Sequence, residues 1–270
     1  MMTIGKDLLK EAKNQALKAL MKSNSQANAQ SVRCDLVPWY DTYFFNWATA
    51  TPGPGWDIIV PTSQTIKFFS DSAPFQYLDG AVPVTIPRTK KWSNHELSDS
   101  IMNSQSAYGI IAFYYQFHPY PGAAFENWFI NRVNPMFKAQ VGKRDTKRWD
   151  QKLGYLNNYR PVDYSAQAAL GNVRIGTVMS SGTFISTNHF SLPTSILEEP
   201  WIIEPKDQCL LELEIENLEA GTRQFYDSLP PYELAKYFLN PSYADTERVQ
   251  GRIYPLAISL GLIGVWCTVS

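Results

Sequence analysis

The sequence has few of the residues from which catalytic and metal sites are usually built. Its three histidines are His95, His118 and His189, and none lies in an HxH or HExxH spacing that would assemble a metal site locally. It contains no GxSxG, GxxxxGK[ST] or GxGxxG motif, which removes the commonest nucleophile elbow and phosphate-binding loops. We therefore expect no enzymatic activity, no cofactor, no metal and no small-molecule substrate.

Cysteine is also scarce. Cys34, Cys209 and Cys267 form no CxxC pair and no metal-ligand spacing. Cys209 falls on the apolar side of a predicted strand, and Cys267 lies near the end of an apolar run, so we expect buried thiols and not disulfides. Buried thiols favour synthesis in a reducing compartment.

Charge is sparse and unevenly distributed. Charged residues make up 18% of the 270 residues and aromatic residues 14%, which favours apolar or neutral surface buried against other subunits. The net charge is -1, but five lysines stand against two carboxylates before Ser31. Residues 138–160 carry seven basic and two acidic side chains, and residues 196–247 carry twelve acidic and three basic ones. This segregation is compatible with subunits that dock through opposite potentials, and also with solvated loops.

The clearest structural pattern lies between Glu198 and Gly221. Here Cys209, Leu211, Leu213 and Ile215 alternate with Leu210, Glu212, Glu214 and Glu216. Strand side chains point to opposite faces in turn, so the pattern predicts a half-buried antiparallel strand with one apolar and one mostly acidic face. The preceding Glu204–Asp207 segment is typical of a turn, since Pro205 presets φ.

Most other segments also read as strands. Short strand-like runs are separated by many of the eighteen prolines, which is typical of a β-sandwich or barrel. We expect an all-β antiparallel sandwich over residues 32–270, with loop insertions near 120–165 and 222–250. Ile253 to Val269 is shorter than the roughly 20 apolar residues of a spanning helix, and we interpret it as two buried strands.

The N-terminus differs from the rest. Thr3 to Lys22 has apolar residues at helical spacing, and Ser23 to Ser31 lacks any hydrophobic anchor, so residues 1–31 are predicted to form a basic amphipathic arm on a flexible tether. One alternative is a helix that packs on its own domain; others are contact with a bilayer surface or with nucleic acid. The lysines that would make such contacts are Lys6, Lys10, Lys13, Lys18 and Lys22.

A second basic segment lies between Lys138 and Arg160, which we place as a long loop. Its mixture of cations and aromatics suits a phosphate backbone and a stacked base, and equally a solvated loop or a contact with an acidic surface. Its candidate contact residues are Lys143, Arg144, Lys147, Arg148, Trp149 and Lys152. The aromatic stretch from Leu36 to Trp47 suits either a sugar-stacking platform or a buried core.

Three successive segments carry a family resemblance: the run Pro200–Gln208, the alternating strand that ends at Asn217, and the closing stretch Gly251–Val269. Their succession resembles the C-terminal half of jelly-roll virion proteins of bacterial viruses. The basic arm with its polar tether is similar to that of capsid proteins, where the arm faces the particle interior.

The resemblance implies a jelly roll, single or double, in a non-enzymatic structural subunit of a virus particle, such as a capsid or vertex protein. It implies assembly with other copies of the chain and with other virion proteins. It also implies contact of the arm with an internal membrane or with packaged nucleic acid. Such a protein is made in the host cytoplasm and resides in the virion.

One segment departs from the resemblance. The proline-interrupted insertion at 225–243 is absent from a minimal jelly roll, so capsid, vertex and tail roles stay open. The main alternative is a carbohydrate- or receptor-binding β-sandwich, such as a viral spike or lectin-like module, which would bind glycans through exposed Trp or Tyr.

Overall fold

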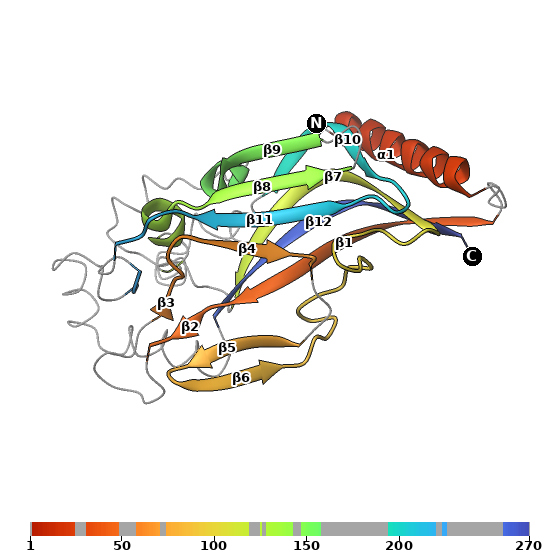
Figure 1. Ribbon diagram of the computed structural model, residues 1–270. Helices are drawn as coiled ribbons and strands as arrows, with labels where there is room; N and C mark the ends of the chain where they lie inside the picture. The colour runs from red at the N-terminus through yellow and green to blue at the C-terminus, as the bar shows by residue number, and fades with distance from the viewer. Residues whose placement is uncertain are drawn as a thin grey trace, which may run out of the picture.

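The computed structural model is predominantly β, with strands in antiparallel sheets and one α-helix in the part of the chain that it describes (Figure 1). That part comprises residues 2–24, 31–48, 58–70, 74–118, 125, 128–142, 147–157, 194–219, 223–225 and 256–269. The helix and the twelve strands are α1 (Met2–Ser23), β1 (Val32–Phe44), β2 (Asn46–Trp47), β3 (Ile58–Ile59), β4 (Gln64–Phe68), β5 (Phe75–Asp79), β6 (Val82–Ile86), β7 (Ser106–His118), β8 (Met136–Val141), β9 (Lys147–Lys152), β10 (Thr194–Ile203), β11 (Cys209–Ile215) and β12 (Ala257–Val269). Two short helical segments, η1 (Phe129–Val133) and η2 (Leu153–Asn157), flank the β8–β9 pair.

Two four-stranded sheets form the body. The first, here the β1 sheet, has the order β1-β12-β7-β10, and the second, the β11 sheet, has the order β4-β11-β8-β9. Every neighbouring pair in both sheets is antiparallel. A smaller sheet, β3-β2-β5-β6, lies beside them (Figure 1). In the smaller sheet β2 and β5 are parallel, whereas both main sheets have the antiparallel, all-β architecture expected from the sequence.

A single large apolar core fills the space between the two main sheets. Trp39, Tyr108 and Phe113 enter it from the β1 sheet, and Leu211 and Phe137 enter it from the β11 sheet. Trp39 stacks on Tyr108 with ring centroids 4.2 Å apart. The aromatic stretch that suited either a sugar platform or a core is thus core at Trp39 and Trp47, whose side chains are 1% and 2% exposed.

β11 has the alternation that its sequence predicts. Cys209, Leu211, Leu213 and Ile215 are buried, and the intervening residues are half-buried. The turn before it is also confirmed: Asp207 N–H donates to Glu204 C=O at 3.0 Å, and Lys206 has a φ of 67°.

The expected loop between Lys138 and Arg160 is wrong over its described part. β8 and β9 form an antiparallel pair with register from Met136↔Lys152 to Val141↔Lys147. The reason is that Trp149 points inward, with its ring centroid 5.5 Å from that of Phe113, so β9 has an apolar anchor that its charged neighbours mask in the sequence. The remaining expected insertion, 222–250, lies outside the described residues except for 223–225.

The C-terminal stretch forms one strand where two were expected. β12 runs from Ala257 to Val269 between β1 and β7, and its pairing with β7 shifts register between Ile263 and Gly264. At this point the two strands approach so closely that a Cβ on residue 264 would stand 2.2 Å from the carbonyl oxygen of Gly109, and only glycine avoids that clash. In the sequence alone Gly264 suggests the end of a strand, whereas in the structure it allows β12 to approach β7 closely.

The expectation of three thiols is also wrong. Cys34 and Cys267 lie directly opposite one another in the β1–β12 register and are joined by a disulfide, whereas Cys209 is free and buried. The two cysteines are 233 residues apart, so only the strand pairing brings them together. The expected reducing compartment rested on the absence of disulfides and loses that support.

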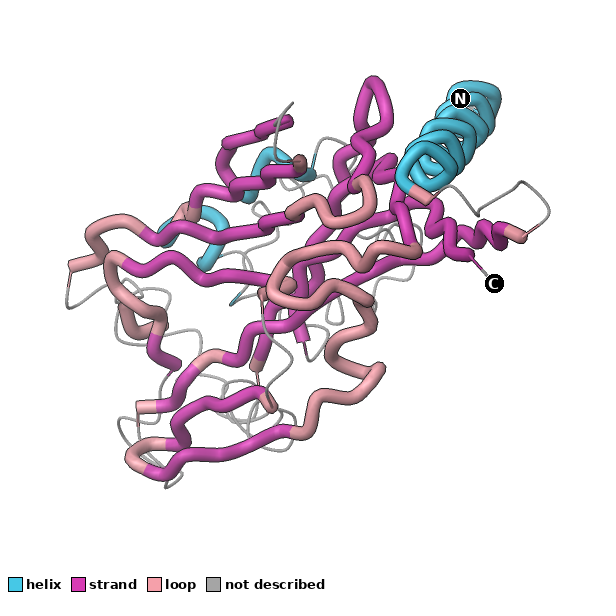
Figure 2. The backbone as a smooth tube through the Cα atoms, turned by 45° about the vertical axis from the view of Figure 1, so that its right-hand side comes forward, coloured by secondary structure: helices cyan, strands magenta, loops and turns pink. Residues whose placement is uncertain are grey.

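α1 packs on the outer face of the β1 sheet, against β7, β12 and β10 (Figure 2). Ala12, Ala16 and Leu20 are fully buried in a cluster with Ala107 and Val265 of the strands. Of the alternatives that the sequence left open, the helix packed on its own body is the one in this structure. Residues 25–30 of the expected tether lie outside the described residues.

Candidate functional site

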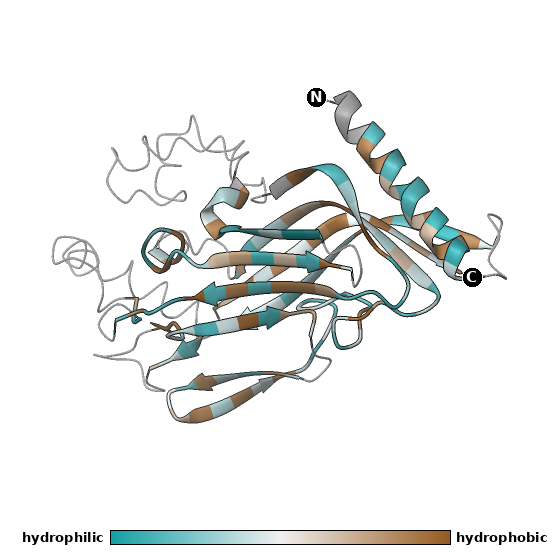
Figure 3. Ribbon diagram, turned by 45° about the horizontal axis from the view of Figure 1, so that its top comes forward, coloured by the Kyte–Doolittle hydropathy of each residue, from teal (hydrophilic) through white to brown (hydrophobic). Residues whose placement is uncertain are grey.

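The exposed face of α1 is the first candidate for a contact surface. Lys10, Lys13, Lys18 and Lys22 lie on this helix away from its buried stripe, and the side chain of Lys6 lies outside the described residues. Figure 3 shows the alternation of hydrophilic and hydrophobic residues along the helix. Because the apolar stripe of α1 is buried on the β1 sheet, this face offers mainly lysine ammonium groups to a partner. Such a surface suits phosphates or other anions.

Two carboxylates moderate that charge. Asp7 and Glu11 are exposed on the same helix, and Glu11 accepts a hydrogen bond from Gln15 at 2.9 Å. The four lysines of α1 whose side chains are described exceed these two acids, so the described surface stays basic. Lys22 also lies in the last helical turn, where a cation interacts favourably with the helix dipole.

The second candidate, the basic segment around β9, is largely engaged within the protein. Lys147 forms an ion pair with Glu199, and Arg148 Nη2 lies 2.6 Å from Asp150 Oδ2. Lys152 Nζ donates to the carbonyl oxygen of Asn134 at 3.4 Å. Lys143 and Arg144 lie outside the described residues.

Trp149 is not placed to stack on a base. Its ring packs tilted against Phe113 and edge-on to Phe137, with centroids 5.5 and 6.2 Å apart. On the neighbouring strands, Lys138 Nζ lies 2.5 Å from Glu214 Oε2, and this hydrogen bond raises the pKa of Lys138. The outer face of the β11 sheet therefore carries cross-strand charge pairs, as a solvated face does.

A serine–histidine contact between β12 and β7 has the appearance of a catalytic pair. His118 Nε2 lies 2.9 Å from Ser259 Oγ, and Ser259 Oγ lies 2.7 Å from Thr42 Oγ1. The Thr42 hydroxyl donates to the carbonyl oxygen of Trp92 at 2.5 Å. Since that uses the one proton of Thr42, Ser259 must donate to Thr42, and His118 must donate to Ser259.

This direction of donation excludes a nucleophile and base arrangement in the structure as it stands. A general base would accept the serine proton, whereas the Nε2 of His118 carries a proton of its own. Ser259 is also 3% exposed, so its hydroxyl is closed to a substrate. Burial, with a smaller effect from the charge of Lys91, lowers the pKa of His118 to about 4 and keeps the ring neutral at pH 7.

A buried carboxylate forms a second polar cluster. Asp41 Oδ1 lies 2.5 Å from Arg88 Nη2, and Asp41 Oδ2 accepts from Phe69 N–H at 2.8 Å. His95 lies 3.9 Å from the same carboxylate, and burial lowers its pKa. Arg88 also lies over the ring of Phe75 at 4.4 Å. Both carboxylate oxygens of Asp41 have a partner. The cluster therefore connects β1 with Phe69, directly after β4, and with Arg88, after β6.

The described residues form neither a grouped metal site nor a membrane-spanning helix. Among the described residues, no three His, Cys, Asp or Glu side chains are grouped so that they would hold a metal ion. No helix within the described ranges combines the length and the apolar character needed to cross a bilayer.

The residues that sequence reasoning missed lie on β1. Cys34 and the exposed side chains of Arg33 and Leu36 lie in the N-terminal part of this strand, and the disulfide partner of Cys34, Cys267, lies opposite it on β12. The alternation of apolar Val32, Cys34 and Leu36 with charged Arg33 and Asp35 is the one local signal that points to a strand there.

Comparison of the chain with family models, curated proteins and solved structures found no match.

Proposed function

We propose that this protein is a non-enzymatic structural subunit of a virus particle, a capsid or vertex protein built on a single jelly roll. The observation that supports this proposal most is the order of the eight body strands that the structure describes. Counted along the chain as β1, β4, β7, β8, β9, β10, β11 and β12, the first sheet takes the first, eighth, third and sixth, and the second takes the second, seventh, fourth and fifth.

That order is the one in which a jelly roll folds its two Greek keys. In a jelly roll the chain crosses repeatedly from one sheet to the other, and the first and last strands are neighbours at one edge. β1 and β12 pair along their whole length, from Val32↔Val269 to Phe44↔Ala257. The small sheet is an addition, because β2, β3, β5 and β6 fall on either side of β4 in the chain.

The described polar clusters favour a scaffold over a reaction site. The carboxylate of Asp41 and the hydroxyl of Ser259 both have their bonding capacity met by neighbouring protein groups. Each cluster connects neighbouring strands by hydrogen bonds, which gives the body the rigidity that a shell subunit needs. Jelly rolls also occur in lectins, which keeps a glycan-binding module as the alternative function.

In the proposed particle, the lysine face of α1 meets an anionic component of the interior. Insertion of α1 into a bilayer would require Ala12, Ala16 and Leu20 to leave their contacts on the β1 sheet. Electrostatic contact with phosphates needs no such rearrangement, so the lysine face suits packaged nucleic acid or the headgroups of an internal membrane, and we take nucleic acid as the first partner to test.

Assembly is tested by size-exclusion chromatography and negative-stain electron microscopy of the full chain over a range of protein and salt concentrations. Closed particles or ordered arrays support a shell subunit. A monodisperse species that binds a glycan array supports the lectin-like alternative and contradicts the proposal.

The role of α1 is tested separately by replacing Lys10, Lys13, Lys18 and Lys22 with Gln. Binding of a single-stranded DNA oligonucleotide is expected to weaken at least about tenfold, with a shallower salt dependence, since each phosphate contact contributes to that slope. The matched control replaces Lys147, Arg148 and Lys152 with Gln, which leaves α1 intact. Equal losses in both variants would contradict the assignment to α1, and binding only to vesicles of anionic lipid would transfer the role to a membrane.

A further inference from the structure

β1 leaves part of one sheet edge open. It is the first strand in the order β1-β12-β7-β10, so among the described strands it pairs on one side alone, with β12. On the other side, Tyr40 N–H donates to Asn94 Oδ1 at 2.8 Å, and Tyr40 C=O accepts from Asn94 N–H at 3.2 Å. Since backbone groups alternate in direction along a strand, those of Val32, Cys34, Leu36 and Pro38 point to the same open side.

The position of Pro38 is consistent with this direction of the backbone groups. A proline inside a strand is tolerated where its nitrogen faces an open edge, and the nitrogen of Pro38 faces away from β12. The side-chain Nδ2 of Asn94 donates to Pro38 C=O at 2.8 Å. Asn94 therefore covers the edge of β1 at Pro38 and Tyr40.

The edge from Val32 to Leu36 has no such cover among the described residues. No described residue outside β12 hydrogen-bonds to the backbone of Cys34 or Leu36. The side chain of Leu36 is 58% exposed. A regular strand with outward N–H and C=O groups is a template for another strand.

Three other edge strands of the described sheets, β6, β9 and β10, are blunted. On β5, Leu78 N–H donates to Asn46 Oδ1, so its backbone faces β2, and Pro83, opposite Leu78 on β6, must point its nitrogen at the open edge where it offers no donor. β9 carries charged side chains along its edge, and the pairing of β10 with β7 is interrupted by a bulge. The Val32–Leu36 segment contains no proline and no bulge, and its two charged residues, Arg33 and Asp35, are of opposite sign.

We propose that two copies of this chain pair antiparallel through Val32–Leu36 of β1, with Cys34 of each copy at the centre. In this register Cys34 lies opposite its own equivalent, Arg33 lies opposite Asp35, and Val32 lies opposite Leu36. The three even-numbered residues would then exchange backbone hydrogen bonds, and the odd-numbered pairs would hold the closer side-chain contacts.

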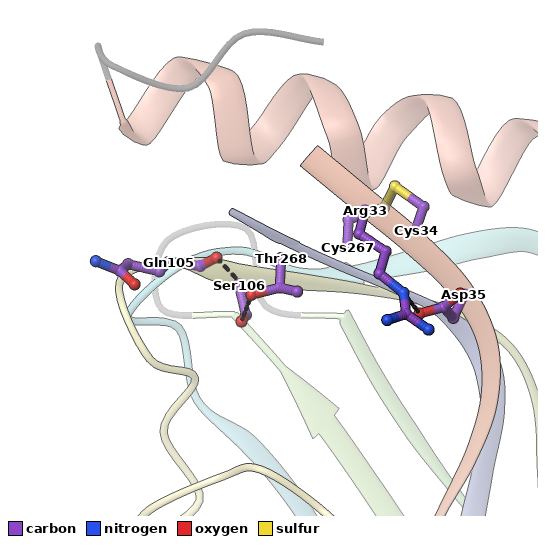
Figure 4. Close-up of a disulfide and its surroundings, with 7 residues drawn as sticks. All are labelled: Arg33, Cys34, Asp35, Gln105, Ser106, Cys267 and Thr268. Atoms are coloured by element: carbon purple, nitrogen blue, oxygen red, sulfur yellow. Dashed lines mark hydrogen bonds and ion pairs between the residues drawn. A yellow bond between two sulfur atoms is a disulfide. The ribbon is translucent and has the colours of Figure 1, made fainter. Parts of the chain in front are cut away.

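The side chains of this segment are complementary to themselves on both faces. Figure 4 shows the disulfide on the side of β1 that faces α1, and Arg33 and Asp35 on the other side. On the first side, Val32 of one copy meets Leu36 of the other. On the second, Arg33 meets Asp35 twice, once in each direction, as a two-fold interface requires.

In the single chain, Arg33 Nε lies 2.6 Å from Asp35 Oδ2 with side chains 73% and 39% exposed. Pairing would exchange the two exposed contacts, one in each copy, for two contacts between the chains. The inference goes beyond the proposed function, because it is argued from the edge of β1 alone and holds for a protein of another role.

The test uses analytical ultracentrifugation of the full chain over a wide concentration range. The wild type is expected to dimerise reversibly. Arg33→Asp and Asp35→Arg each place like charges opposite one another twice, and each is expected to weaken the dimer at least about tenfold. An equimolar mixture of the two variants is expected to dimerise as the wild type does, because the two carboxylates of the first variant then face the two guanidinium groups of the second.

A second measurement reports on the backbone. Amide exchange followed by NMR is expected to slow at Cys34 and Leu36 as protein concentration rises, whereas the amides of Arg33 and Asp35 face β12 and stay unchanged. Leu36→Pro removes one outward donor and is expected to abolish the dimer while near-UV circular dichroism stays that of the wild type.

Several outcomes would overturn the inference: a wild-type chain that stays monomeric, charge variants that dimerise unchanged, or a mixture that fails to restore pairing. Failure of the proposed function is distinguishable, since a dimer that never proceeds to particles contradicts only the shell role. Particles without concentration-dependent protection of the Leu36 amide contradict only the edge pairing.

Discussion

Gly109 on β7 lies directly beneath Ala12 of α1: a Cβ placed on Gly109 would stand 2.7 Å from the carbonyl oxygen of Ala12. The helix is therefore seated on the sheet at a point that only a residue without a side chain leaves open. Small residues on both partners, Ala12 and Ala16 on the helix and Ala107 and Gly109 on the strand, allow this approach.

We predict that Gly109→Val lifts α1 from the β1 sheet. The valine side chain would collide with helix backbone, which cannot move aside without losing the buried contacts of Ala12 and Ala16. Amide exchange in α1 is expected to rise at least about tenfold, while β11 on the opposite sheet keeps its protection. The control is Ile111→Val on the same strand, which removes only one methylene; equal exchange in both variants would contradict the seating of α1.

We predict that the Cys34–Cys267 disulfide stabilises the body by about 2 to 5 kcal/mol, because it closes a very long loop between the first and last body strands. Urea midpoints of the wild type are expected to fall in the presence of a dithiol reductant, and those of Cys34→Ala/Cys267→Ala to be insensitive to it. The control is Cys209→Ala, whose midpoint should still respond. Three alkylatable thiols in the purified unfolded chain would show that the pair is not oxidised.

We predict that Asp41→Asn destabilises the fold by about 3 kcal/mol. Neutralising the carboxylate removes the negative charge that faces the guanidinium of Arg88, whose side chain is 15% exposed. The double variant Asp41→Asn/Arg88→Gln is expected to lose less than the sum of the single changes, as measured by urea unfolding. Asp150→Asn breaks an exposed pair with Arg148 and should leave the midpoint unchanged; a loss equal to that of Asp41→Asn would contradict the importance of burial.

We predict that acid destabilises the fold through His118. Its pKa is about 4 against an ordinary 6.5, so between these values the unfolded chain binds a proton that the folded chain excludes. The contribution is fully present above pH 6.5 and is lost as the pH falls toward 4, on the order of 3 kcal/mol in all.

The measurement is the free energy of unfolding between pH 7 and 4.5 for the wild type and His118→Gln. The glutamine retains a donor for Ser259 without a titratable ring. Its curve is expected to be flatter than that of the wild type, and a parallel curve would assign the acid sensitivity to other groups. His95→Gln serves as a comparison, because burial lowers the pKa of His95 in the same direction.

Local patterns predicted the elements whose two faces differ in polarity. β11 was recognisable because its buried and solvent-facing residues alternate, and α1 because its apolar residues recur at helical spacing. β9 was missed because charged residues surround its single inward anchor, Trp149. β1 was missed because Pro38 and a run of aromatics obscure its alternation, and a proline there is acceptable only at a sheet edge.

Some features of the candidate site were likewise predictable from the sequence, and others were not. The lysines of α1 were found from the sequence, since their place away from the buried stripe follows from the helix period. The other features depend on contacts between distant segments. These are the ion pairs of the β9 cations, the hydrogen bond from Ser259 to Thr42, and the ion pair of Asp41 with Arg88.

Taken alone, the order of amino acids determined the secondary structure of strongly amphipathic segments and the all-β class, because both follow from the direction in which successive side chains point. Only the tertiary structure decided which strands are neighbours, and with it the Cys34–Cys267 bond, the seat of α1 and the open edge at Leu36. The disulfide and the open edge depend on register between residues more than two hundred positions apart, and the position of α1 depends on the contact between Ala12 and Gly109. No local pattern encodes either.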